Sequence, residues 1–348
     1  MLVCDSSIHY QGELEKRVKQ AASKIVQFSD FKPNPLYESV IKGVKLFRKE
    51  GCDAIIAVGG GSAIDVAKCI KLYSTLPGEG EQGAWLMARI VPNGIPFFAI
   101  PTTAGTGSEA TRYAVVYYEG EKQSISSNSI IPGVVLLEPR VLNTLPIYQK
   151  KATMCDALCH AIESLWSVNS TEESKKYSKA AIEGFLDHMD GYLNNTEKGN
   201  AGMLMVAHNA GKAINITQTT AGHAMCYKVT SMFGCAHGHA AILCNRILFP
   251  WMTDNIDKCI DQRGKEYLRE TLDELGIAIG GRDARSGAAI LKGIFKSLDL
   301  SIPEATEDQF EELRKSVHLV RLKNHPIAMD EETIEALYHD ILRSNYES

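Results

Sequence analysis

The feature that most restricts the possible folds of this chain is a run of three glycines between an apolar strand and an apolar helix. Asp53-Ala-Ile-Ile-Ala-Val58 is typical of a buried strand, and Gly59-Gly60-Gly61 follow it directly. Ser62 can then cap a helix that extends to about Tyr73. A strand, a tight turn and a helix in this order predict the βα unit of an α/β fold.

The glycine-rich turn has two possible roles. Backbone N–H groups at the start of a helix favour an anion such as a pyrophosphate. Alternatively, the glycines only permit a tight turn with positive φ. The spacing matches neither the GxGxxG fingerprint nor a Walker loop. A second loop of small and hydroxyl-bearing residues, Thr102–Ser108, follows the expected strand Pro96–Ile100. Two such loops after parallel strands lie where open α/β sheets bind ligands.

The pattern of the chain changes near residue 145. Before that point short β-branched runs alternate with amphipathic stretches, which predicts a parallel sheet covered by helices. After it, long helical periodicities dominate. We therefore expect a domain over residues 1–145 and a helical domain over residues 146–348. The further elements expected in the first domain are helices at Glu13–Val26 and Pro35–Lys49 and strands at Tyr113–Tyr118 and Val134–Leu137.

Composition excludes several classes of protein. The chain has 348 residues, 45% of them hydrophobic and 23% charged, with a net charge of −5. This balance argues against disorder and against a nucleic-acid partner. The nine cysteines are scattered without CxxC spacing, which indicates reduced thiols in the cytoplasm. Because no apolar run is long enough to span a bilayer, we expect no membrane partner and a cytoplasmic protein.

Histidines and a carboxylate recur on apolar segments of the helical half. Asp156 and His160 are four residues apart, so a helix places both on one face. His223, His237 and His239 follow in two further apolar segments. One carboxylate and three of these imidazoles suit a divalent transition metal, Fe²⁺ or Zn²⁺, with a position left open for substrate. The alternative is a helical ion pair beside unrelated core histidines.

Four ordered motifs resemble those of the iron-containing (group III) alcohol dehydrogenases over essentially the whole chain. They are Gly59–Lys68, Pro101–Glu109, Asp156–Ser164 and the spacing from His223 to His237, with Asn324-His-Pro326 in the tail. The resemblance implies a Rossmann-like α/β N-terminal domain, an all-α metal-binding C-terminal domain and a nicotinamide cofactor in the cleft between them, in a dehydroquinate synthase-like architecture.

The family's functional residues can be assigned here by motif. By this resemblance the metal ligands are Asp156, His160, His223 and His237. The cofactor-binding residues are Asp5, Asn34, Gly60, Gly61, Ser62, Asp65, Thr102, Thr103, Thr106 and Lys122. A carboxylate at Asp5 would accept hydrogen bonds from the adenosine ribose and repel a 2′-phosphate, so NAD(H) is favoured over NADP(H).

One position departs from the family pattern. Many members carry a further histidine four residues after the third ligand, where this chain has Tyr227. We therefore take Tyr227 and His239 as candidates for a catalytic proton relay. His239 is alternatively an outer partner of the metal ligands or a solvated helix residue. The metal would act as a Lewis acid towards an aldehyde oxygen and the cofactor would supply hydride.

Several stretches resemble the phosphonoacetaldehyde reductase branch of the family, including Trp166–Ser174 and Gly211–Thr217. The resemblance implies an NAD(P)H-linked reductase of a phosphonate-bearing aldehyde, with Arg112, Lys212 and Lys228 as candidate cations for an anionic substrate. The alternatives are a short-chain alcohol or diol dehydrogenase with a neutral substrate, a dehydroquinate synthase-like lyase, and a non-catalytic nucleotide or metabolite sensor.

Two further expectations follow from the resemblance. We expect the protein to be a homodimer with a small alcohol or aldehyde as its substrate. Relative to the family, the chain begins at a strand that other members reach after roughly 25 to 35 residues. The cofactor domain is therefore expected to be short at its N-terminal side.

Overall fold

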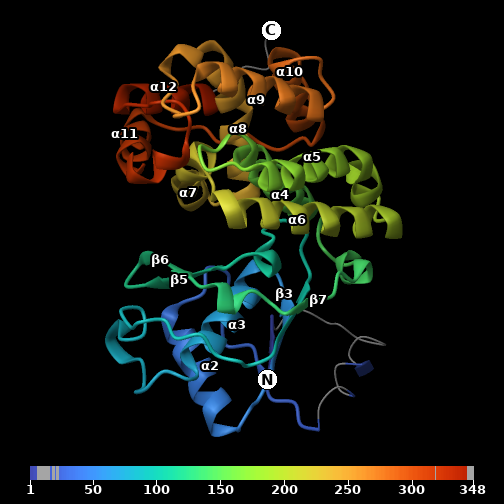
Figure 1. Ribbon diagram of the computed structural model, residues 1–348, viewed down its shortest axis with the longest axis vertical. Coiled ribbons are helices and arrows are strands. Elements are labelled where there is room, and N and C mark those ends of the chain that lie inside the picture. Colours follow the sequence, from blue (N-terminus) through green and yellow to red (C-terminus); the bar gives the residue numbers. More distant parts are fainter. Residues whose placement is uncertain (6–15, 18–19, 21–22, 318, 343–348) are drawn as a thin grey trace. The chain divides into compact units, whose positions relative to one another are not determined.

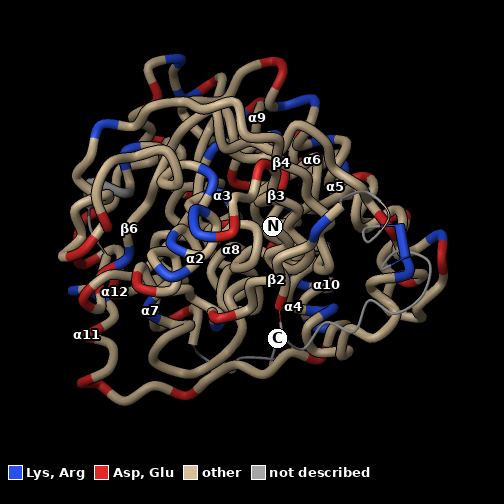
Figure 2. The backbone as a smooth tube through the Cα atoms, turned by 90° about the horizontal axis from the view of Figure 1, so that it is seen from below, with Lys and Arg blue, Asp and Glu red and all other residues tan. Residues whose placement is uncertain are grey.

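The chain divides into two compact units, Met1–Leu145 and Pro146–Ser348, in a computed structural model (Figure 1). The structure describes residues 1–5, 16–17, 20, 23–317 and 319–342. Charged residues of both signs are interspersed along the described chain (Figure 2). Within the described residues, no helix is both long and apolar enough to cross a membrane.

A parallel sheet forms the centre of the first unit. Among the described residues its strands lie in the order β2-β1-β3-β4-β7. Their bounds are β1 Leu2–Cys4, β2 Gln27–Phe28, β3 Ile55–Gly59, β4 Phe97–Pro101 and β7 Val134–Val135. Cys4 is paired with Val58, and Gly59 with Pro101. This register places the loops that follow β1, β3 and β4 at one edge of the sheet.

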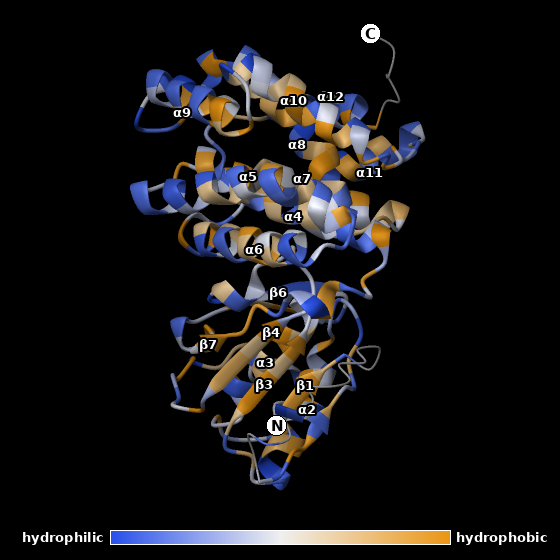
Figure 3. Cartoon of the chain, turned by 90° about the vertical axis from the view of Figure 1, so that its right-hand side faces the viewer, coloured by the Kyte–Doolittle hydropathy of each residue, from blue (hydrophilic) through white to orange (hydrophobic). Residues whose placement is uncertain are grey.

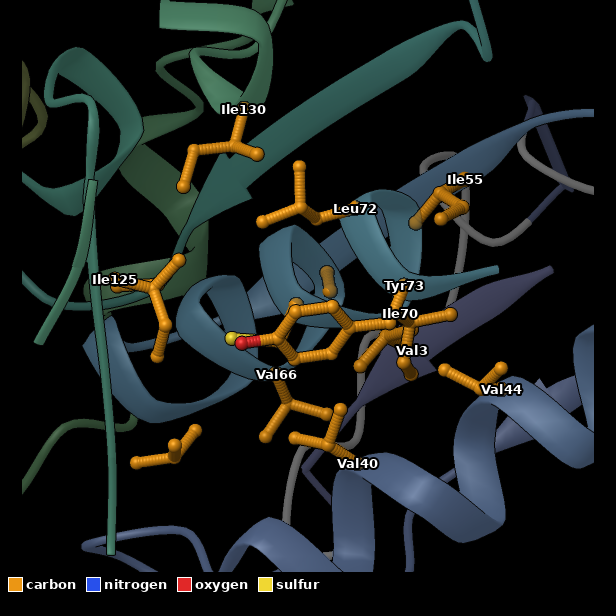
Figure 4. Packing of buried hydrophobic residues seen from close by; sticks show 14 of the residues in the cluster. Val3, Val40, Val44, Ile55, Val66, Ile70, Leu72, Tyr73, Ile125 and Ile130 are labelled. Carbon is orange, nitrogen blue, oxygen red and sulfur yellow. The ribbon is translucent and has the colours of Figure 1, made fainter. Parts of the chain in front are cut away.

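Two helices, α2 (Tyr37–Lys49) and α3 (Gly61–Tyr73), pack on one face of this sheet. Side chains of β1, β3 and both helices form one apolar cluster, part of which Figure 4 shows around Tyr73. The opposite face contributes a smaller cluster. The strands β3 and β4 are apolar along their length, as expected for a sheet buried on both faces (Figure 3).

Beside the parallel sheet lies an antiparallel hairpin of β5 (Tyr113–Tyr118) and β6 (Glu121–Ser126). Short 3₁₀ turns complete the unit. They are η1 Glu81–Gly83, η2 Ser108–Ala110, η3 Asn128–Ile130 and η4 Pro139–Leu142. The hairpin packs against α3, and the backbone N–H of Tyr117 donates to the carbonyl of Pro35 at 2.8 Å.

The second unit is helical. Its helices are α4 Ile147–Trp166, α5 Glu172–Leu193, α6 Glu197–Thr217, α7 Ala221–Phe233, α8 His237–Asp254, α9 Lys265–Ala278, α10 Ala284–Ser297, α11 Glu307–Ser316 and α12 Glu331–Ile341, with 3₁₀ turns η5 Ile256–Lys258 and η6 Leu319–Asn324. Helices α4, α5 and α6 pack against one another, and α8 packs against α4 and α7. The α/β and all-α classes are thus confirmed.

Some local expectations need correction. Of the helix expected over Glu13–Val26, residues 16, 17 and 20 are helical and residues 23–26 are not, while the other seven residues lie outside the described ones. Ser62 does not cap α3: the N-cap is Gly60, in an extended conformation, and Ser62 lies within the first turn. The strand expected over Val134–Leu137 is limited to its first two residues. Strands β2 and β6 carry too few apolar residues to be expected from the sequence.

A buried histidine in the second unit predicts a pH dependence of stability. His325 is fully buried, its ring meets Trp166 edge to face, and neither ring nitrogen has a hydrogen-bond partner. Burial lowers the pKa of His325 to about 4, partly offset by Glu163. The unfolded chain therefore binds an extra proton between pH 6.5 and 4, so stability falls as the pH falls through this window.

We expect His325→Phe to remove this contribution of His325 to the pH dependence of stability. The free energy of unfolding of the wild type relative to the variant should drop by about 3 kcal/mol between pH 7 and pH 4. Denaturant unfolding at a series of pH values measures this difference. Parallel stability curves for the two proteins would contradict the assignment.

Candidate metal centre and cofactor loops

Helix α4 presents three polar side chains on one buried face. Asp156, His160 and Glu163 are spaced by four and three residues, so their side chains are neighbours. All three are buried, with exposed fractions of 3%, 7% and 0%. Polar groups are costly to bury unless each has a partner. The partners come from α7 and α8.

Helices α7 and α8 each bring one histidine to this face near their first residues. His223 is the third residue of α7, and His237 is the first residue of α8. The close approach of α8 depends on Gly238, since a Cβ atom there would lie 2.0 Å from the carbonyl oxygen of Ala152 and 2.6 Å from Cβ of Asp156. Only glycine lets the start of α8 lie directly on α4.

Three imidazole nitrogens converge on a single carboxylate oxygen. The distances to Asp156 Oδ1 are 3.4 Å from His223 Nε2, 3.9 Å from His160 Nε2 and 3.9 Å from His237 Nε2. Ligands about 2.1 Å from a tetrahedral metal ion lie about 3.4 Å from one another. The ligand atoms of Asp156, His223 and His237 all lie within 4.8 Å of one another. These residues can hold a divalent ion.

His160 lies at the margin of this group. Its ring stacks on that of His223, with centroids 4.4 Å apart and an interplanar angle of 13°. It is not one of the three residues whose ligand atoms all lie within 4.8 Å. The four residues expected as ligands are thus brought together, three of them tightly.

The electrostatics of the centre favour a positive charge. Burial alone raises the pKa of Asp156, but His160, His223 and His237 outweigh it and hold that pKa well below its usual range. Burial lowers the pKa of His223, but Glu163 and Asp156 outweigh it and raise that pKa to about 9. His223 lies between the buried carboxylates of Asp156 and Glu163 and is therefore stabilised as a cation. The same negative charges would stabilise a bound divalent ion.

Glu163 anchors the centre from the side opposite to Asp156. Its Oε1 accepts a 2.6 Å hydrogen bond from His223 Nδ1 and a 2.9 Å bond from Asn245 Nδ2. Its Oε2 accepts from the backbone N–H of Thr220 at 2.6 Å and from the Thr220 hydroxyl at 2.9 Å. In the neutral form that can bind a metal, His223 donates its Nδ1–H to Glu163 and carries its lone pair on Nε2, which faces Asp156. A carboxylate behind a histidine is a common support for a metal ligand.

The two proton-relay candidates differ in their surroundings. The ring of Tyr227 stacks on that of His237, with centroids 5.3 Å apart. His239 is buried, and both of its ring nitrogens are engaged: Nδ1 lies 3.1 Å from the Tyr148 hydroxyl and Nε2 2.8 Å from the carbonyl oxygen of Ser301. His239 is therefore not a solvated residue, and its part in a relay stays a prediction.

In the first unit the two loops expected to bind cofactor lie against each other. A Cβ at Gly60 would lie 3.3 Å from Thr103, and a Cβ at Gly61 would lie 2.9 Å from Cγ2 of Thr106. Thr102 is tied to β3 by a 3.0 Å bond from its N–H to the carbonyl of Gly59. Helix α3 begins between these loops without a side-chain cap. The arrangement fits an anion at the helix start.

The structure gives Asp65 a role in holding the second loop. Its Oδ1 accepts a 2.6 Å bond from the Ser108 hydroxyl, and its Oδ2 accepts a 3.0 Å bond from Val115 N–H. The buried Lys68, one turn further along α3, donates to oxygens of Ser108, Thr111 and Tyr113 over 2.6–3.1 Å. Burial lowers the pKa of Lys68 to about 8, partly offset by Asp65. These two side chains fix the loop to α3.

We expect Lys68→Met to disorganise this loop, because it leaves several buried oxygens without a donor. The free energy of unfolding should fall by about 3 kcal/mol, and the KM for the nicotinamide cofactor should rise. Lys71→Met is the matched control, since Lys71 lies buried on the same helix but donates to Asn93. An unchanged KM in a folded Lys68→Met protein would contradict this expectation.

The remaining cofactor candidates lie at two places in the first unit. Asp5 follows β1, whose last residue, Cys4, is paired with Val58, so it lies beside the glycine turn. Asn34 is exposed with a φ of 57°, next to Pro35, which accepts the hydrogen bond from Tyr117. Lys122 is the partner of Tyr117 in the hairpin. Asn34 and Lys122 thus flank the same strand, β5.

The cations considered for an anionic substrate each have a neighbour already. Lys228 forms a 2.5 Å ion pair with Glu312. Arg112 donates to the hydroxyl of Tyr113 at 2.9 Å. The Lys212 ammonium lies 5.4 Å from the ring centroid of Tyr177.

An Asp/His cluster on a helical unit, with paired glycine and threonine loops on an α/β unit, fits an enzyme that uses a metal and a nucleotide cofactor. Comparison with known families agrees. Residues 1–139 match the model of iron-containing alcohol dehydrogenases, and residues 150–342 match the C-terminal model of that family. The chain belongs to the iron-containing alcohol dehydrogenase family and is an NAD(P)-dependent oxidoreductase of that type.

Individual relatives are similar over most of the chain. A phosphonoacetaldehyde reductase of Streptomyces viridochromogenes is 29% identical over 312 residues, which cover 86% of this chain and 79% of that protein. An NAD-dependent methanol dehydrogenase of Bacillus methanolicus is 29% identical over 259 residues, 72% of this chain and 66% of that protein. The sulfoacetaldehyde reductase structure from Bifidobacterium kashiwanohense, with NAD⁺, has a TM-score of 0.88 at 24% identity, covering 99% of this chain and 91% of that one. The expected fold and family are confirmed.

Proposed function

We propose that this protein is an Fe²⁺-dependent, NADH-linked reductase of small aldehydes, with phosphonoacetaldehyde as its substrate and 2-hydroxyethylphosphonate as its product. The observation that supports a metal-dependent reduction is the convergence of His160, His223 and His237 on Asp156 Oδ1. The substrate rests on the 29% identity to a phosphonoacetaldehyde reductase. Zn²⁺ suits the same donor set, so metal analysis belongs to the test.

In this proposal each side chain has a defined task. Asp156, His160, His223 and His237 hold the ion, and Glu163 fixes the orientation of His223. The chemistry supplied by the bound groups is polarisation of the aldehyde carbonyl by the ion and hydride by the nicotinamide. Tyr227, stacked on His237, is the candidate to pass the proton that the product hydroxyl requires.

The cofactor assignment concerns the first unit. The helix start at Gly61, with Ser62 and the threonines of the second loop, would receive the pyrophosphate. Asp5 lies beside this turn, and a carboxylate there favours NADH because it repels a 2′-phosphate. Asn34 and Lys122 would line the same site from the hairpin side.

A neutral alcohol or aldehyde is the second candidate substrate, favoured by the 29% identity to a methanol dehydrogenase. It is also consistent with the ion pair that already engages Lys228.

The test is an oxidation screen of NADH and NADPH with metal-loaded protein. Phosphonoacetaldehyde is compared with acetaldehyde and propionaldehyde at equal concentrations, and the metal content is measured in parallel. We expect the highest kcat/KM with NADH and phosphonoacetaldehyde. A higher kcat/KM for the neutral aldehydes would reject phosphonoacetaldehyde as the substrate. Turnover without bound metal would reject the metal-dependent mechanism.

A further inference from the structure

The thiol of Cys226 lies beside the metal centre, where the reaction described above assigns it no role. Cys226 is fully buried on α7, three residues after His223. Its Sγ lies 3.4 Å from the carbonyl oxygen of His223 and 3.6 Å from Nδ1 of His237. Both contacts are within the range of sulfur hydrogen bonds. The thiol therefore links the backbone of one candidate ligand to the ring of another.

The direction of the two hydrogen bonds follows from the chemistry of a thiol. A thiol has one hydrogen, and a carbonyl oxygen can only accept, so the S–H donates to the carbonyl of His223. The sulfur lone pairs then remain for His237, and the tautomer of His237 that matches them is the one that donates its Nδ1–H. A histidine with its proton on Nδ1 carries its lone pair on Nε2. That nitrogen faces Asp156 Oδ1 at 3.9 Å.

His237 needs such a support more than its neighbours do. It is the first residue of α8, and its side chain is 36% exposed, whereas that of His223 is 2% exposed and bound to Glu163. A metal-binding histidine usually donates its other ring N–H to a carboxylate, a carbonyl or water, which fixes the tautomer and the ring orientation. For His223 the acceptor is Glu163. For His237 the structure places a sulfur at the corresponding position.

We propose that Cys226 is a positioning residue for metal binding: it accepts the Nδ1–H of His237 and thereby holds Nε2 towards the ion. The proposal rests on the metal centre of the proposed function. Cys226 is not itself a ligand in this arrangement, because its sulfur contacts the ring nitrogen that is turned away from Asp156. The competing explanation is that the thiol only fills space in the core, as buried cysteines often do.

The test measures metal affinity in metal-free full-length protein. Zn²⁺ binding is followed by competition with a chromophoric chelator, and Co²⁺ binding by its visible absorption, which reports ligand geometry. Four variants are compared with the wild type: Cys226→Ala, Cys226→Ser, Cys244→Ala and His237→Ala. Cys244 is the matched control, a fully buried thiol on α8. Melting temperatures show whether each variant is folded.

We expect Cys226→Ala to raise the Kd for Zn²⁺ about 10- to 100-fold and to alter the Co²⁺ spectrum. Cys226→Ser should stay within about threefold of wild type, because a hydroxyl can donate to the same carbonyl and accept from the same N–H. Cys244→Ala should leave the Kd unchanged.

Three results would overturn the proposal. They are an unchanged Kd in Cys226→Ala, an equal loss in Cys226→Ala and Cys244→Ala, and a Cys226→Ser protein as weak as Cys226→Ala. The failure of the underlying metal assignment looks different: the wild type would then bind no more metal than His237→Ala.

Discussion

Replacement of His237 by alanine is expected to remove the metal and the activity while leaving the fold intact. His237 supplies one of the three ligand atoms that lie within 4.8 Å of one another. Its side chain is 36% exposed, so its removal opens no large cavity and costs little stability. The metal content should fall from about one ion per chain to near zero. Because a Lewis acid contributes several kcal/mol to such a reaction, kcat/KM should fall about 10³-fold or more.

The control for this variant is His339→Ala. His339 is also partly exposed on a helix of the same unit, and its ring stacks on Phe310, far along the chain from the centre. His339→Ala should keep its metal and its activity. Elemental analysis, aldehyde-dependent NADH oxidation and thermal unfolding are measured on the same preparations. Wild-type turnover by a metal-free His237→Ala protein would contradict metal-dependent catalysis.

The sequence was sufficient to predict the parts of the molecule that depend on local patterns. The βα unit around Gly59–Gly61 is recognisable because an apolar strand and a glycine run are contiguous in sequence. Asp156 and His160 were predicted to share a helix face by their spacing alone. Strand β5 matches its expected bounds, Tyr113–Tyr118, since it is a run rich in β-branched and aromatic residues. Each of these predictions needed no information about distant segments.

Other features depend on contacts between distant segments. Glu163 belongs to a recognisable motif, but only the fold shows that its carboxylate is held by residues 57 to 82 positions away. Besides that motif, its spacing of three from His160 was the available signal in the sequence. Cys226 gave no such signal, because a buried cysteine in an apolar helix is unremarkable in sequence. The engagement of both ring nitrogens of His239, by Tyr148 and Ser301, was equally invisible.

The second large effect is expected from Glu163→Gln, which keeps the size of the side chain and removes its charge. The carboxylate accepts from N–H and O–H groups of Thr220, His223 and Asn245. An amide offers one oxygen and directs an NH₂ group at the remaining donors, so two donors would face each other in a fully buried site. Loss of one partner of a buried pair costs about 3–5 kcal/mol, and we expect the free energy of unfolding to fall by that amount.

Metal affinity should fall as well, about 10- to 100-fold, because Nδ1 of His223 loses its acceptor and its Nε2 loses its fixed orientation. Asn245→Ala separates this effect from a general loosening of the core, since it removes one neutral donor to Glu163 and leaves the bond to His223 in place. It should lower stability less and leave the Kd for metal close to wild type. If Glu163→Gln instead bound metal as tightly as the wild type, the charge behind His223 would not support the centre. The 2.6 Å contact would then serve only the packing of α7 on α4, because the substitution preserves the shape of the side chain.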